Sequence, residues 1–179
     1  MRKLNVIITA CILVLFIIHG VFGALLLTGS GSTALKPVAW TAAGLTVVHI
    51  VISLKLTFDT LKIQNHTGVS YFKENRLFWA RRISGFAVMV LLVFHMMAFG
   101  YSKGGFYRLK AFDDIKLVTQ ILFIAALGTH VISNAKPMLI SFGIKSLKPR
   151  TADILIVLSV LLFCMAAAIV IYYLKWNAF

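Results

Sequence analysis

Long uncharged stretches, separated by short clusters of charge, dominate the chain. Five of these stretches approach or exceed the roughly 20 apolar residues that an α-helix needs to cross a bilayer. The hydrophobic pattern therefore predicts an all-α integral membrane protein with a bundle of five transmembrane helices. We expect one membrane domain over residues 1–179, with helices at residues 4–28, 37–57, 80–101, 114–135 and 152–174.

Local signals suggest where these helices begin and end. Gly29 to Ser32 is typical of a turn after the first helix. Pro37 suits the first turn of the second helix, and Thr151 is a candidate N-cap for the fifth. Lys136 and Pro137 predict the end of the fourth helix. We expect residues 58–78 to form a loop, containing His66.

Composition supports the membrane interpretation and argues against a soluble class. Hydrophobic residues make up 60% of the chain and charged residues 13%, and mean hydropathy is +0.95. Soluble domains are closer to half apolar and a quarter charged. The net charge of +13 would suggest nucleic acid in a soluble chain, but the sequence has no basic-aromatic motif for it. Contact with anionic lipid explains the charge better, and we expect no nucleic-acid partner.

The lysines and arginines also predict an orientation, because they gather in cytoplasmic loops. With five spans, the side of the N-terminus holds twelve of them and the other side six. We expect a multi-pass protein of the inner (cytoplasmic) membrane, with the N-terminus in the cytoplasm and the C-terminus outside. Leu4 to Thr28 is too long for a signal-peptide core and lacks an Ala-x-Ala site, so we expect it to be retained.

Histidines give the main indication of function. Each of the first four predicted helices carries one, and the fifth carries none. An ionisable side chain within a membrane is costly, so each is a candidate functional group. With a rise of about 1.5 Å per residue, His19 and His95 fall in the outer half of the membrane and His49 and His130 in the inner half.

Two pairs of imidazoles at two depths are typical of two bis-histidine b haems, which transfer electrons. We expect His19 and His95 to hold the outer haem iron, and His49 and His130 the inner one. Arg81 and Arg82 are candidate partners of haem propionates, although positive-inside anchoring also explains them. Nearby small and hydroxyl residues could admit a porphyrin or orient imidazoles, although ordinary helix packing explains the glycines as well. They are Gly20, Gly23, Gly44, Gly85, Gly128, Thr46, Ser53, Thr129 and Ser133.

Two stretches resemble a known family. Arg81 to His95 has Arg, Gly and Phe-His in order, and Leu127 to Asn134 is followed by Pro137 and Ser141-Phe142-Gly143. Both resemble the cytochrome b membrane anchor of succinate dehydrogenase and fumarate reductase (complex II), in its dihaem five-helix form. The resemblance spans nearly the whole chain. Its histidine pattern is fairly specific and its short motifs are weak.

The resemblance implies two haem b groups held by the four histidines, and a quinone (menaquinone) beside a haem. It implies flavoprotein and iron-sulfur partner subunits on the cytoplasmic face, docked on the basic segments 62–82 and 136–150, and it leaves room for a dimer of complexes. Such a subunit is not catalytic for succinate; it anchors the enzyme and passes electrons to or from quinone. One departure is that Leu127-Gly128-Thr129 precede His130, where some dihaem relatives have a glutamate for proton transfer.

Other interpretations stay open at this point. The chain could anchor another respiratory oxidoreductase, such as a nitrate reductase or a hydrogenase, although nitrate reductase anchors concentrate their ligands on two helices. It could hold a single haem. It could also be a haem-free transport or structural protein whose histidines form hydrogen bonds between helices or relay protons. Cys11 and Cys164 lie within apolar stretches and we expect them to be packing residues, since no Cys-x-x-Cys-His occurs.

Overall fold

In the computed structural model, residues 1–29, 36–68, 76–103, 106–143 and 148–178 are described. Five helices form almost all of this part of the chain. They are α1 (Arg2–Thr28), α2 (Lys36–Thr67), α4 (Arg76–Ala98), α5 (Asp114–Ser141) and α6 (Lys148–Asn177). Each is long and apolar enough to cross a bilayer, so the predicted all-α, multi-pass membrane bundle is confirmed.

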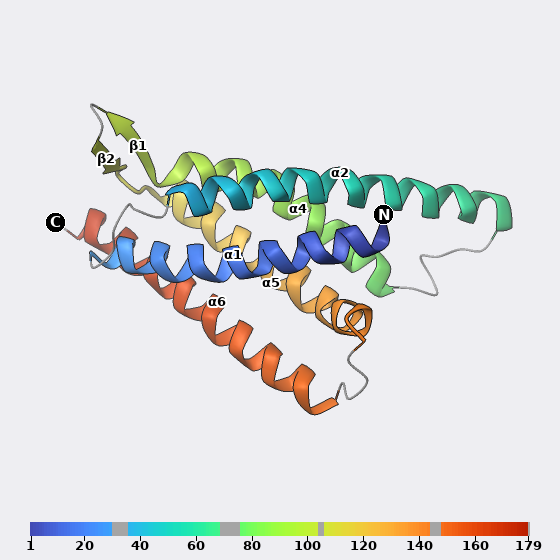
Figure 1. Cartoon of the computed structure of the whole chain (residues 1–179). Coiled ribbons are helices and arrows are strands. Elements are labelled where there is room, and N and C mark those ends of the chain that lie inside the picture. The colour runs from blue at the N-terminus through green and yellow to red at the C-terminus, as the bar shows by residue number, and fades with distance from the viewer. Residues whose placement is uncertain (30–35, 69–75, 104–105, 144–147, 179) are drawn as a thin grey trace.

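Successive long helices run in opposite directions, and the two termini lie at opposite ends of the molecule (Figure 1). The helix α1 packs on α2 and α6, while α5 packs on α4 and α6. Large apolar side chains such as Val14, Val51 and Phe163 are exposed along the helices, as suits surfaces that face lipid. The bundle is therefore built from close neighbouring pairs rather than around one dense core.

Several helix boundaries differ from those predicted. The helix α2 continues to Thr67, so His66 is an exposed residue of a helix rather than of a loop. The helix α5 passes through Pro137 and ends at Ser141. The helix α6 begins at Lys148, so Thr151 lies inside it and is not its N-cap. Gly29 does end α1, with φ of 98°, but residues 30–32 of the predicted turn lie outside the described residues.

A short β-hairpin, which the hydrophobic pattern missed, follows α4. Strands β1 (Gly100–Lys103) and β2 (Phe106–Leu109) are antiparallel, with Lys103 opposite Phe106. They shorten α4, which ends at Ala98 instead of continuing to residue 101. The sequence did carry a signal, because a Gly-Gly dipeptide between two runs with aromatic residues is typical of a hairpin.

The hairpin end of the bundle holds its buried apolar cluster, formed by Ala98, Phe112, Ile169 and Tyr172. The Tyr172 hydroxyl donates to the Lys110 carbonyl at 2.7 Å, which ties α6 to the segment before α5. Asp113 caps α5 by accepting from the Lys116 N–H at 2.9 Å. The Lys116 ammonium, 2.7 Å from the same carboxylate, helps to hold the pKa of Asp113 below its usual value.

Candidate paired-histidine sites

The four intramembrane histidines meet in two pairs. The ring centres of His19 on α1 and His95 on α4 are 6.0 Å apart, and the ring planes are inclined by 79°. The ring centres of His49 on α2 and His130 on α5 are 6.4 Å apart, with planes inclined by 74°. The structure thus brings together the same histidines that depth along the helices had paired.

Each pair crosses the bundle rather than joining neighbouring helices. Neither α1 with α4 nor α2 with α5 is among the closely packed helix pairs of the described chain. The imidazoles therefore approach one another across wider separations than ordinary helix contacts. Histidines that only formed hydrogen bonds between packed helices would not need to face one another across the bundle.

The spacing within each pair suits two imidazoles on opposite sides of one metal ion. A metal–imidazole bond is about 2.0 Å long, and the ring centre lies about 1.1 Å beyond the nitrogen, so two trans imidazoles have centres about 6 Å apart. The observed 6.0 and 6.4 Å agree with this value. In the described residues no three His, Cys, Asp or Glu side chains gather as a metal site, so the histidines meet only in twos.

His95 is held by α5. Its Nδ1 lies 2.8 Å from Oε1 of Gln120, a side chain with 0% exposure. An amide oxygen only accepts, so Nδ1 carries the proton and the Nε2 lone pair remains free for a metal. The Phe123 ring stacks on the imidazole with centres 4.8 Å apart. Nε2 of Gln120 is buried and has no hydrogen-bond partner among the described residues.

His130 is held by α4. Its Nδ1 lies 3.2 Å from the Arg81 carbonyl and 3.3 Å from the Ser84 hydroxyl. The carbonyl again requires the proton on Nδ1 and leaves Nε2 free. Gly85 makes the approach possible, since a Cβ there would stand 3.0 Å from Cε1 of the imidazole.

His49 is held by the beginning of α1. Its Nδ1 lies 3.0 Å from the Asn5 side-chain oxygen and 3.2 Å from the Thr9 hydroxyl. Ser53, one turn along α2, lies 3.4 Å from the opposite nitrogen, Nε2. His19 has no hydrogen-bond partner in the described part of the chain. Three of the four imidazoles are therefore oriented by a neighbouring helix through Nδ1.

The residues that orient the imidazoles are mostly not the ones predicted. Thr46, Thr129 and Ser133 donate to carbonyls of their own helices instead, and only Ser53 reaches a ring. The residues that do orient them are Asn5, Thr9, Ser84 and Gln120. Polar side chains within apolar spans are rare and usually pair with something, and this signal could have found Asn5 and Gln120.

The predicted glycines divide into two kinds. Gly20 faces the Met165 side chain, Gly85 faces His130, and a Cβ at Gly128 would meet Leu162 at 3.3 Å. Close helix packing explains these three. Gly23 and Gly44 have nothing within 4 Å of the position that a Cβ would take. Of the glycines expected around the histidines, three therefore allow close packing and two adjoin open space.

The two arginines that precede the His95 stretch have different surroundings. Arg81 donates from Nε to the Ser133 carbonyl at 3.1 Å and lines a pocket between α4 and α5. Arg82 lies with its guanidinium 5.0 Å from the Phe78 ring centre. The buried Nε of Arg82 has no hydrogen-bond partner among the described residues. Arg82 thus keeps an unused buried donor that could bind an acidic group, whereas the Nε of Arg81 is already used.

Comparisons with family models, with curated proteins and with solved structures find no match to this chain. The geometry of the histidine pairs is therefore the main indication of function.

Proposed function

We propose that this chain is the dihaem cytochrome b membrane anchor of a succinate:quinone oxidoreductase or quinol:fumarate reductase. The observation that supports it is the two imidazole pairs, whose ring centres are 6.0 and 6.4 Å apart, a spacing at which both imidazoles of a pair could hold one metal ion. His19 with His95 and His49 with His130 would each hold one haem b, which when bound would supply one-electron transfer.

The protein's own residues would prepare both sites. Gln120, the Arg81 carbonyl and Asn5 accept hydrogen bonds from Nδ1–H of His95, His130 and His49, which leaves the Nε2 of each imidazole unprotonated and able to bind a metal. Such hydrogen bonds fix the tautomer and make the ligand nitrogen more basic. Arg82, whose buried Nε has no partner among the described residues, would donate to a propionate beside the His49–His130 pair.

The partners in this proposal follow from the family resemblance. A flavoprotein and an iron-sulfur subunit would dock on the basic segments 62–82 and 136–150, at the cytoplasmic end, and menaquinone would bind near a haem. Residues 69–75 and 144–147 of these segments lie outside the described residues. The chain would exchange electrons with quinone, while succinate chemistry would belong to the partner.

Haem content and reduced-minus-oxidised spectra of the purified full chain test the proposal directly. We expect two b-type haems. His19→Ala and His95→Ala should each remove the same haem, and His49→Ala and His130→Ala the other. His66→Ala is the matched control, because His66 is exposed on α2 away from both pairs. A folded wild-type protein that binds no haem under haem-replete expression would overturn the proposal and favour a haem-free role for the histidines.

A second experiment separates complex II from other dihaem anchors. Affinity purification of the intact complex from the native membrane should recover a flavoprotein and an iron-sulfur subunit, with succinate-dependent reduction of a quinone analogue. Recovery of a molybdenum or nickel enzyme instead would retain the haem sites and reject this partner assignment.

A further inference from the structure

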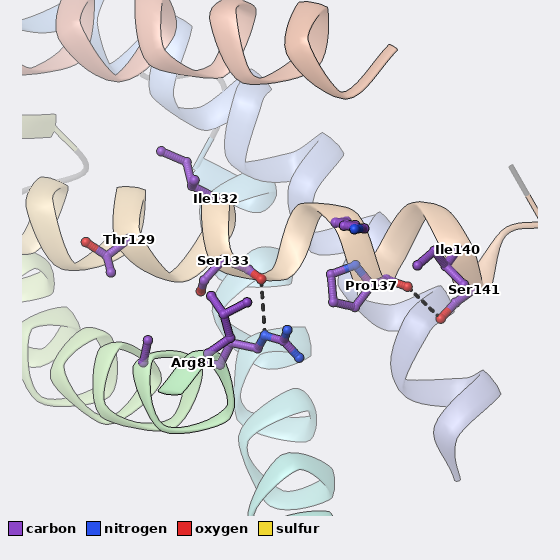
Figure 2. Close-up of a pocket in the computed structure, with 10 residues that line it drawn as sticks. Arg81, Thr129, Ile132, Ser133, Pro137, Ile140 and Ser141 are labelled. Carbon is purple, nitrogen blue, oxygen red and sulfur yellow. Dashed lines mark hydrogen bonds between the residues drawn. The ribbon is translucent and has the colours of Figure 1, made fainter. Parts of the chain in front are cut away.

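A pocket of about 950 Å³ opens between the beginning of α4 and the second half of α5, and none of the four paired histidines lines it. Figure 2 shows Arg81 reaching from α4 toward Ser133 and Pro137 of α5 at this place. Four apolar side chains form much of its wall: Leu77, Ala80, Ile132 and Ile140. Leu77, Ile132 and Ile140 are 58%, 42% and 54% exposed, so the wall faces the lipid side of the bundle.

The charge of the pocket is positive and uncompensated. Arg81 and Lys136 both line it, and no carboxylate does so among the described residues. Neither Arg81 nor Lys136 forms an ion pair with any described residue. The salt bridge found among the described residues joins Lys116 to Asp113, outside the pocket. A negatively charged ligand would therefore be attracted by both cations without displacing an internal partner.

A hydrogen bond to α5 orients the Arg81 side chain before any ligand binds. Pro137 has no N–H, so the Ser133 carbonyl, four residues earlier, loses its helical hydrogen bond. Arg81 replaces that bond through Nε at 3.1 Å. The terminal guanidinium nitrogens then remain available, and they are the donors that bind phosphate in a fork.

The hydroxyl groups of the pocket are not free to donate hydrogen bonds to a ligand. Thr129, Ser133 and Ser141 each donate to a carbonyl of α5, at 2.9, 3.1 and 2.8 Å. Their protons are thus already used, and the donors left for a ligand are the two cations. This set suits an anion rich in acceptor oxygens better than a neutral polar molecule.

The level of the pocket in the bundle suits a lipid headgroup. Arg81 lies about 8 Å along α4 from its start at Arg76, and Lys136 about 8 Å from the end of α5 at Ser141. Charged side chains at this distance from the ends of a span lie near the boundary between hydrocarbon and headgroups. The apolar wall continues from there along both helices.

From these features we propose that the α4–α5 pocket binds an acidic phospholipid. The phosphate lies between Arg81 and Lys136, and an acyl chain lies against Leu77, Ala80, Ile132 and Ile140. The proposal does not rest on the haem proposal, because it uses the side chains of Arg81 and Lys136 and none of the four paired histidines. It assigns this face of the bundle a specific lipid rather than bulk membrane contact.

Native mass spectrometry of the full chain in a mild detergent, with phosphatidylglycerol or phosphatidylcholine added, tests the proposal. We expect one phosphatidylglycerol to bind in preference to phosphatidylcholine. Lys136→Gln should weaken that binding about fivefold, the usual effect of one cation near an anionic lipid. Lys136→Arg should retain it. Lys55→Gln, which removes an exposed lysine of α2 outside the pocket, should leave it unchanged.

A substitution in the apolar wall of the pocket and two competing ligands complete the test. Ala80→Phe fills the pocket without changing its charge and should also reduce phosphatidylglycerol binding, with helical content checked by circular dichroism. Equal binding of both lipids, or equal effects of Lys136→Gln and Lys55→Gln, would overturn the proposal. Displacement of the lipid by millimolar inorganic phosphate would indicate a phosphate site instead, and displacement by a short-chain quinone would indicate a quinone site; either result rejects the lipid.

Discussion

The side chain of Arg81 donates from Nε to the backbone carbonyl of Ser133 at 3.1 Å, and this carbonyl is the one that Pro137 leaves without a helical partner. Arg81→Met would leave this half-buried carbonyl without a donor, and the cost should lie at or below the about 1–3 kcal/mol of a fully buried group. In a Pro137→Ala background the helix supplies an N–H, so the same substitution should cost clearly less. A double-mutant cycle on unfolding in detergent measures the difference.

Arg76→Met is the control for this cycle, because Arg76 is exposed at the start of the same helix. Its cost should be small and the same with Pro137 or Ala. Equal costs of Arg81→Met in the two backgrounds would show that the hydrogen bond to Ser133 does not stabilise the proline-containing helix.

Gly85 should matter for one histidine pair only. A Cβ at this position would lie 3.0 Å from Cε1 and 3.2 Å from Nδ1 of His130, a ring already held by the Arg81 carbonyl. We expect Gly85→Ala to lower haem affinity at the His49–His130 pair on the order of tenfold, as disturbed ligand support typically does. The difference spectrum should show the His19–His95 haem unchanged.

Gly23→Ala provides the comparison for Gly85→Ala, since nothing lies within 4 Å of its added Cβ. It should leave the His49–His130 haem in place. Loss of that haem in both variants would point to a general effect of alanine in the helices rather than to contact with His130.

Gln120 should tune the His95 site electronically. Oε1 of the fully buried Gln120 accepts from the His95 Nδ1–H at 2.8 Å. Gln120→Leu removes this acceptor and should raise the midpoint potential of the haem at that pair, since a less basic imidazole stabilises the oxidised iron less. Gln120→Glu offers a stronger acceptor and should lower it. Spectroelectrochemical titration resolves the two haems, and the His49–His130 haem serves as an internal reference.

A purely structural role of Gln120 predicts a different result. Both substitutions would then reduce haem content or stability and shift the potential in the same direction. Opposite shifts from Leu and Glu, at equal haem content, are what the hydrogen bond to His95 requires.

The carboxylate of Asp113 should make a pH-dependent contribution to stability. Its pKa is lowered by hydrogen bonds from the Lys116 side chain and backbone, so the contribution is fully present above the unfolded pKa of about 3.9 and is lost as pH falls through the folded value. Asp113→Ala should therefore lower the thermal midpoint near pH 7. The gap from wild type should begin to narrow below about pH 4 and close once the pH is below the lowered pKa of the folded state. A gap that persists at acid pH would mean that the cap does not depend on ionisation.

The number of helices and the pairing of the histidines could be predicted because both follow from distances along the sequence. Span length fixes which segments are helices, and the rise per residue fixes the depth of each histidine. Histidines at equal depth on different helices are candidates for contact, and His19 with His95 and His49 with His130 do lie together. Haem ligation by these pairs stays a prediction.

The support of the imidazoles could not be predicted, because it depends on how helices are rotated about their axes. Thr46 and Ser53 flank His49 within its own helix, yet the Nδ1 partners Asn5 and Thr9 come from α1. The continuation of α5 past Pro137 was missed for a similar reason. Local sequence predicts a break there, and a side chain from α4 supplies the donor that the helix lacks.

The crossed arrangement of the pairs has a consequence for biosynthesis. The closely packed neighbours α1 with α2 and α4 with α5 form two halves, and each half contributes one histidine to each pair. Neither half can therefore assemble a pair by itself as it leaves the ribosome. His19 acquires its counterpart when α4 inserts, and His49 has to wait until α5 follows. The two pairs are thus completed one after the other, in an order set by the chain's own direction of synthesis.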